Sequence, residues 1–188
     1  MTTTASATLS RRDFLRLSAA GSLLLATGAL TAGLSGCARS EPPAPGYRTL
    51  RPGDVALFTA LAPVVLGPAL PAEAREQHLS SLLQSIDGSC TLLAPAGQKT
   101  LRQLFDLLDG GLTRRLATGV SKPWAAASEA EIGRFLERWR DSSLGLFNAG
   151  YRGLNKLIVA NWYALPAGLA STGYPGPWAP MYAAVNAA

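Results

Sequence analysis

The sequence of 188 residues has very few of the side chains on which enzymes and metal sites depend. It contains two cysteines and one histidine, and it has no motif for covalent haem attachment. Neither a dinucleotide-binding glycine motif between a strand and a helix nor a phosphate-binding loop motif is present. His78 has only Glu73 and Glu76 as nearby acidic residues, a sparse set for a metal. We therefore expect a chain that is not itself an enzyme and that holds no cofactor or metal.

Charge is also scarce and mixed in sign. The formal net charge is +5, and the N-terminal 36 residues contribute three arginines and one aspartate to it. Without them, 14 basic and 11 acidic residues remain among 152, a net charge of +3. This charge is too small and too scattered to predict binding to nucleic acid.

The N-terminus has the composition of an export signal. Residues 10–16 read SRRDFLR and precede an uncharged apolar segment, residues 17–36, that is rich in Gly, Ser and Thr. Arg11, Arg12, Phe14 and Leu15 occupy the positions of a twin-arginine signal, which predicts export to the periplasm by the Tat translocase. A chance arginine pair before a general secretory signal or a transmembrane helix is the alternative.

The segment LSGC, residues 34–37, resembles a bacterial lipobox. This resemblance implies that Cys37 is lipidated, becomes the first mature residue and anchors the protein to a membrane. Cleavage nearby by a general signal peptidase is the alternative. We expect residues 1–36 to be the signal, 37–48 the lipidated cysteine and a proline-rich tether, and 49–188 a helical domain. Cys90 then has no disulfide partner, and we predict that it is a buried small apolar residue.

Apolar residues recur at helical spacing along the predicted domain. Three stripes with spacing i, i+3, i+4, i+7 are Leu79, Leu82, Leu83 and Ile86; Leu101, Leu104, Phe105 and Leu108; and Ile132, Phe135, Leu136 and Trp139. An earlier stripe is Leu57, Leu61, Val64 and Val65, and a later one is Leu144, Phe147, Tyr151, Leu154, Ile158 and Trp162. No alternating strand pattern occurs. We predict an all-α fold, a single compact bundle of about five helices.

Local signals mark several helix ends. Pro63 and Gly67 are expected to kink or end the first helix. Gly110 and Gly111 predict a stop after the stripe that ends at Leu108, and residues 128–131, SEAE, predict a capping box.

The last predicted helix contains Gly145, Gly150 and Gly153, each of which costs about 1 kcal/mol. We expect these glycines to allow close packing against another backbone. The density of proline and glycine in residues 165–178 predicts an irregular C-terminal arm, which either packs over the bundle or binds a partner.

The twin-arginine segment SRRDFL and the tail NWYALPAGLASTGYPGP, residues 161–177, resemble the small subunits of membrane-associated flavin dehydrogenases. The families are gluconate 2-dehydrogenase subunit 3 and the small subunits of sorbitol and fructose dehydrogenases. The resemblance implies a large subunit of the glucose-methanol-choline type that contains FAD and is exported already folded, together with a cytochrome c subunit in many complexes.

Under this resemblance the chain is a non-catalytic subunit that binds, matures and co-exports its partner. The candidate interface residues are Tyr151, Trp162, Tyr163, Tyr174, Pro175 and Trp178. Two alternatives stay open: a stand-alone periplasmic lipoprotein that serves as a binding or structural module, and an independent metal or redox protein. The second is disfavoured by the scarcity of His, Cys and clustered carboxylates.

Overall fold

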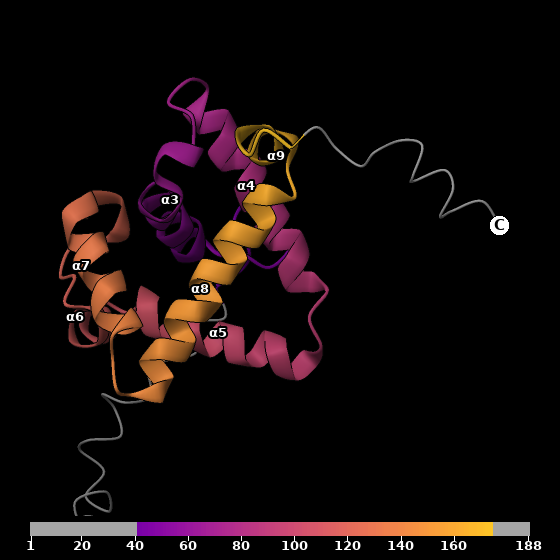
Figure 1. The fold of residues 1–188 in the computed structure, drawn as a ribbon. Coiled ribbons are helices and arrows are strands. Elements are labelled where there is room, and N and C mark those ends of the chain that lie inside the picture. Colours follow the sequence, from indigo (N-terminus) through magenta and orange to yellow (C-terminus); the bar gives the residue numbers. More distant parts are fainter. Residues whose placement is uncertain (1–40, 175–188) are drawn as a thin grey trace, which may run out of the picture. The chain divides into compact units, whose positions relative to one another are not determined.

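The computed structural model describes residues 41–174. These residues form helices and connecting segments without a strand, which confirms the predicted all-α class. The α-helices, labelled as in Figure 1, are α3 (Pro52–Leu66), α4 (Arg75–Thr91), α5 (Pro95–Asp109), α6 (Gly111–Thr118), α7 (Glu129–Arg140), α8 (Gly145–Tyr163) and α9 (Pro166–Ser171). Two 3₁₀ helices are η1 (Gly67–Ala69) and η2 (Trp124–Ala126).

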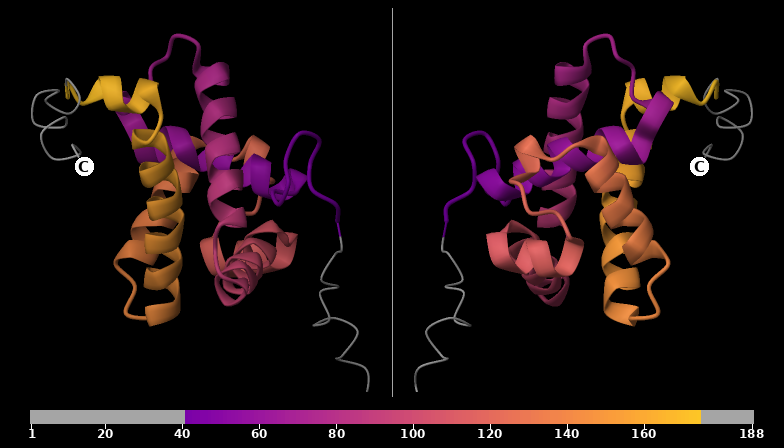
Figure 2. Two further views of the ribbon diagram at one scale, coloured as in Figure 1. Left: turned by 90° about the vertical axis from the view of Figure 1, so that its right-hand side faces the viewer. Right: turned by 90° about the vertical axis from the view of Figure 1, so that its left-hand side faces the viewer.

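Helix α3 is the element around which the others pack. It contacts α4, α5, α7 and α8 as well as η2. Helices α4 and α8 lie side by side, and α3 crosses them (Figure 2). Helices α5 and α6 pack on each other at one end of this body, and α9 packs against α8 (Figure 1). The buried apolar side chains of α3 to α8 form one core, and Ala167 of α9 packs against it.

The predicted stripes supply this core. Every member of the stripe on α7 is buried, whereas Leu79 on α4 and Leu101 and Leu104 on α5 are only partly buried. Leu144, the first member of the later stripe, precedes α8 and is 59% exposed. Helix α3 continues through Pro63 and ends where Gly67 adopts a φ of +51°, a conformation that glycine reaches at little cost. The apolar periodicity therefore predicted which faces are buried.

The predicted capping box begins α7. The hydroxyl of Ser128 accepts a hydrogen bond from the backbone N–H of Glu131 at 3.3 Å. In return, the Glu131 carboxylate accepts from the backbone N–H and the hydroxyl of Ser128 at 2.9 and 2.8 Å. These bonds hold the pKa of Glu131 at about 2. The reciprocal bonds satisfy donors that the first turn of a helix otherwise leaves free.

The contact between α7 and α8 explains one of the three glycines. A Cβ added at Gly150 would lie 2.5 Å from the Cζ3 atom of Trp139, whereas Gly145 and Gly153 face open space. The Trp139 ring also stacks on Phe147 at a centroid distance of 5.2 Å. The expectation of close approach is therefore correct at Gly150 alone, and the neighbour there is an indole ring and not a backbone.

Two of the seven α-helices among the described residues, α6 and α9, are additional to the expected five or so. The predicted stop after Asp109 is confirmed, but α6 begins again at Gly111. The expectation of an irregular arm is wrong for α9, because Pro166 occupies the first helical position, where its missing N–H costs nothing. Gly168 packs against the backbone of Trp162, and Gly173 has a φ of +67° just after the helix.

The segment before α3 belongs to the folded body. Ala44 is buried, and its backbone N–H donates to the carbonyl of Leu50 at 2.8 Å. The Asp87 carboxylate of α4 accepts from the backbone N–H groups of Arg48, Thr49 and Leu50 at 2.8 to 2.9 Å. The predicted tether was expected to run to residue 48; the structure corrects this, because residues 44–48 are held by the fold.

Residues Pro52–Ala69 are long and apolar enough to cross a membrane, judged by length and composition alone. This stretch is α3 with η1, and Leu57, Phe58 and Leu61 of α3 are fully buried in the core. A core helix of a folded domain can be equally long and apolar, so we interpret α3 as a core helix.

Candidate functional site

The residues singled out from the sequence do not form one site. Arg11, Arg12, Phe14, Leu15 and Cys37 of the export signal and lipobox lie outside the described residues, as do Pro175 and Trp178 of the arm. The four remaining interface candidates are Tyr151, Trp162, Tyr163 and Tyr174. Three of these belong to α8, where the twelve steps from Tyr151 to Tyr163 correspond to a rise of about 18 Å.

Trp162 is corrected from a surface candidate to a core residue. Its side chain is completely buried, and His78 of α4 packs edge-on against its ring at a centroid distance of 5.8 Å. The residue lies four positions after the buried Ile158 and eight after Leu154, so the apolar stripe of α8 already indicated burial. Tyr163 and Tyr174 are exposed, as an interface role requires.

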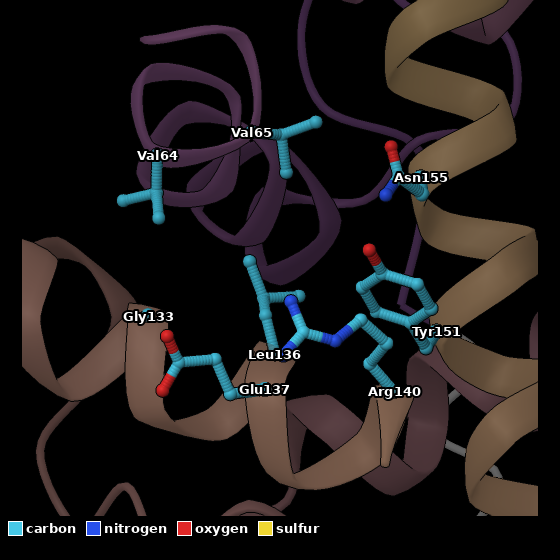
Figure 3. A pocket seen from close by; sticks show the side chains of 8 residues that line it. All are labelled: Val64, Val65, Gly133, Leu136, Glu137, Arg140, Tyr151 and Asn155. Atoms are coloured by element: carbon cyan, nitrogen blue, oxygen red, sulfur yellow. The ribbon is translucent and has the colours of Figure 1, made fainter.

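Tyr151 lines a cavity of about 210 Å³ between α3, α7 and α8 (Figure 3). The apolar part of the lining consists of Val64 and Val65 from α3 and Leu136 from α7. The polar part is supplied by Glu137, Arg140, Tyr151 and Asn155. The lining of the cavity therefore combines apolar side chains with hydrogen-bond donors and acceptors.

The charge at this cavity is fixed by a neighbouring ion pair. The Arg140 Nε and Nη2 atoms donate to the Asp141 carboxylate at 2.9 and 3.0 Å. These hydrogen bonds lower the pKa of Asp141 and raise that of Arg140. Figure 3 shows the guanidinium of Arg140 between Leu136 and the ring of Tyr151 in this view. Arg140 therefore stays positively charged at this cavity.

A second hollow lies further along the same two helices. It has a volume of about 290 Å³ and is lined mainly by apolar atoms of α3, η2 and α7, among them Ala60, Pro63, Trp124 and Ile132. Small-molecule sites are typically about 300–1,000 Å³ in volume. The first hollow is smaller than this range and the second lies at its lower limit, so each is of a size to receive a single side chain.

No cluster of three or more His, Cys, Asp or Glu side chains in residues 41–174 is arranged to hold a metal ion. Glu73 and Glu76 are exposed at the start of α4, while His78 turns its ring to Trp162. Cys90 is buried, as predicted, and burial together with the charge of Asp87 raises the pKa of its thiol to about 11. A thiol in this state is a poor nucleophile.

The sequence reasoning missed a group of buried charges at the start of α3. The Asp54 carboxylate is almost fully buried and accepts from the backbone N–H of Arg51 at 2.8 Å and from Nη1 of Arg102 at 2.7 Å. The side chain of Arg51 also pairs with Asp106 of α5. The spacing of Arg51 and Asp54 was a weak signal for the pair, but the partners on α5 are distant in sequence.

No family model and no curated protein matches this sequence, and no solved structure matches its fold.

Proposed function

We propose that this chain is a non-catalytic accessory subunit that binds a flavin-dependent dehydrogenase, assists its maturation and is exported with it in the folded state. The proposal begins from the similarity of the segments SRRDFL and NWYALPAGLASTGYPGP to the small subunits of such dehydrogenases. In this account the FAD is held by the partner subunit, and this chain carries no cofactor. The substrate class of the complex is alcohols, sugars or polyols.

The observation that carries the proposal is the cavity lined by Tyr151. Its volume of about 210 Å³ suits one inserted side chain, and its lining combines apolar side chains with hydrogen-bond donors and acceptors, as a pocket for an interface anchor does.

Exposed apolar side chains support the same role. Leu112 and Leu116 lie one turn apart on α6 and are 71% and 75% exposed. Leu144 and Leu146 are exposed at the start of α8, and Leu92 and Leu93 at the end of α4. Single exposed leucines are normal on a monomer, whereas contiguous apolar surface is typical of sites that bind another protein, and Leu112 and Leu116 are neighbours on α6.

The proposed location is the periplasmic side of a membrane. Tat export would be directed by Arg11, Arg12, Phe14 and Leu15, and a lipid on Cys37 would anchor the chain. Because the Tat system carries folded proteins, a flavoprotein loaded in the cytoplasm could cross with this chain. A cytochrome c subunit would complete electron transfer in a complex of this kind.

The test is purification of the tagged full-length chain from the membranes of its native cell. We expect a larger protein to co-purify, to show the absorption spectrum of oxidised flavin and to be identified by mass spectrometry. Replacing Arg11 and Arg12 by lysine should leave both proteins in the cytoplasm. Arg16→Lys is the matched control, because lysine is the usual residue at that position of the signal and export should continue. A colourless, stable monomer would contradict the proposal and favour a stand-alone periplasmic lipoprotein.

A further inference from the structure

We infer that the outer face of α8 is the surface that binds an acidic patch on the partner protein, an inference that rests on the proposed function. Along this face, exposed residues recur at every third or fourth position. They are Leu146, Ala149, Arg152, Lys156, Ala160 and Tyr163. We call this set the α8 stripe. At 1.5 Å per residue it is about 25 Å long.

The centre of the α8 stripe carries two cations that are left without acidic partners. Arg152 and Lys156 are exposed, lie one turn apart, and make no hydrogen bond or ion pair with any residue between 41 and 174. The sequence from Ser142 to Tyr174 contains no aspartate or glutamate. Like charges at this spacing repel each other slightly. An acidic surface placed over them would gain two attractions and would not have to break an existing ion pair.

Some cations elsewhere in the described residues have acidic partners, such as Arg102 with Asp54 at 2.7 Å and Lys122 with Glu131 at 3.4 Å. Others, including Lys99 and Arg115, have none. What sets α8 apart is that this 19-residue helix contains no acidic residue, so its exposed charges are all positive.

The flanks of the stripe favour contact with another protein surface. Leu146 is 75% exposed at one end of the stripe and Tyr163 is 40% exposed at the other. Between them, the small side chains of Ala149 and Ala160 allow another surface to approach the helix closely. Aromatic residues and arginine are enriched at protein interfaces. Tyr151 and Asn155 of the same helix line the cavity of about 210 Å³.

A protein fits this surface better than an anionic membrane does. Segments that bind anionic lipid usually contain clusters of four to eight basic residues, each worth about 1 kcal/mol, and the α8 stripe has two. The two cations of the α8 stripe therefore fall short of a lipid-binding cluster.

The test is the double variant Arg152→Glu/Lys156→Glu in the tagged full-length chain, purified from the native cell as above. We expect the flavoprotein retained per subunit to fall about tenfold, because two attractive charges become repulsive. Retention by the unaltered chain should also decline as salt is raised. The matched control is Lys99→Glu/Arg115→Glu, which makes the same change of charge at exposed positions of α5 and α6. It should retain the partner within about twofold.

The outcomes separate the inference from the function on which it rests. If the unaltered chain brings down no flavoprotein, the proposed function fails. If both double variants retain the flavoprotein equally, the proposed function stands and the α8 stripe is not the docking surface. The neutral variant Arg152→Gln/Lys156→Gln should give an intermediate loss, and equal losses in both double variants would show an effect of net charge alone and overturn the inference.

The membrane is tested separately with vesicles of phosphatidylethanolamine and phosphatidylglycerol. The probe is the mature chain with Cys37→Ser, with and without the reversal of Arg152 and Lys156. We expect neither form to sediment with the vesicles. Sedimentation that is lost on charge reversal would assign the stripe to lipid and overturn the inference.

Discussion

The N-terminal side of the body and the α8 side treat charged residues in opposite ways. Before and within the first turn of α3, Arg51 and Asp54 are buried, and they connect to Arg102 and Asp106 of α5. On α8, Arg152 and Lys156 are exposed and unpaired within residues 41–174. Buried charges must be paired to be tolerated, whereas exposed charges cost the fold little. The comparison indicates that the first group holds the fold and that the second is available for binding.

The largest expected effect is that of Asp54→Ala. Removing this buried carboxylate takes a partner from Arg102 and from the backbone N–H of Arg51, and we expect the free energy of unfolding to fall by about 3–5 kcal/mol. Urea denaturation followed by circular dichroism measures it. Asp141→Ala is the control, because its ion pair with Arg140 is exposed and should contribute little to stability. Equal losses of stability in the two variants would contradict the distinction between buried and exposed charges.

The Asp87 clamp, in which the Asp87 carboxylate accepts from the backbone of residues 48–50, should make a smaller contribution to stability. This contribution should depend on pH. Hydrogen bonds from the backbone of residues 48–50 and from the Thr49 hydroxyl outweigh the effect of burial and hold the pKa of Asp87 below its usual value. We expect Asp87→Asn to lower the free energy of unfolding by about 1.5–3 kcal/mol at neutral pH.

The sign of the pH dependence follows from the lowered pKa of Asp87. The stabilisation is fully present above the unfolded-state pKa, about 3.9, and is lost as the pH falls through the lower folded-state pKa. Urea denaturation at a series of pH values should show the difference between the unaltered chain and Asp87→Asn shrinking below about pH 4. A difference that stays constant down to pH 2 would contradict the clamp.

The smallest effects are expected for alanine substitutions at two glycines of α8. Gly150 packs against Trp139, whereas Gly153 faces open space. Gly153→Ala should raise the free energy of unfolding by about 0.5–1 kcal/mol, because a Cβ there meets no neighbour and alanine favours the helix. Gly150→Ala should lower it by about 1–3 kcal/mol through the contact with Trp139. Thermal unfolding of the two variants gives the comparison, and a shift in the same direction for both would contradict it.

The helices with strong apolar periodicity could be predicted from the sequence, together with the cap at Ser128 and the burial of Cys90. Helices α6 and α9 could not, because α6 leaves Leu112 and Leu116 exposed and α9 is only six residues long. Short helices of this kind depend on tertiary packing more than on propensity.

The parts of the candidate site were predicted unevenly for a similar reason. Tyr151 was singled out for its residue type, but the cavity beside it needs Val64 and Leu136 from two other helices. The Asp87 clamp joins residues almost 40 positions apart, a distance over which periodicity carries no information. The unpaired state of Arg152 and Lys156 became visible only once the neighbours of α8 were known.

Whether the exposed cations of α8 are dispensable for the fold is tested most directly by the free energy of unfolding of the Arg152→Glu/Lys156→Glu variant. We expect a value within about 0.5 kcal/mol of the unaltered chain, since exposed substitutions without partners rarely exceed this, even though the variant loses its flavoprotein. A loss of about 2 kcal/mol or more would contradict the account, because it would show that the cations of the α8 stripe hold the fold together.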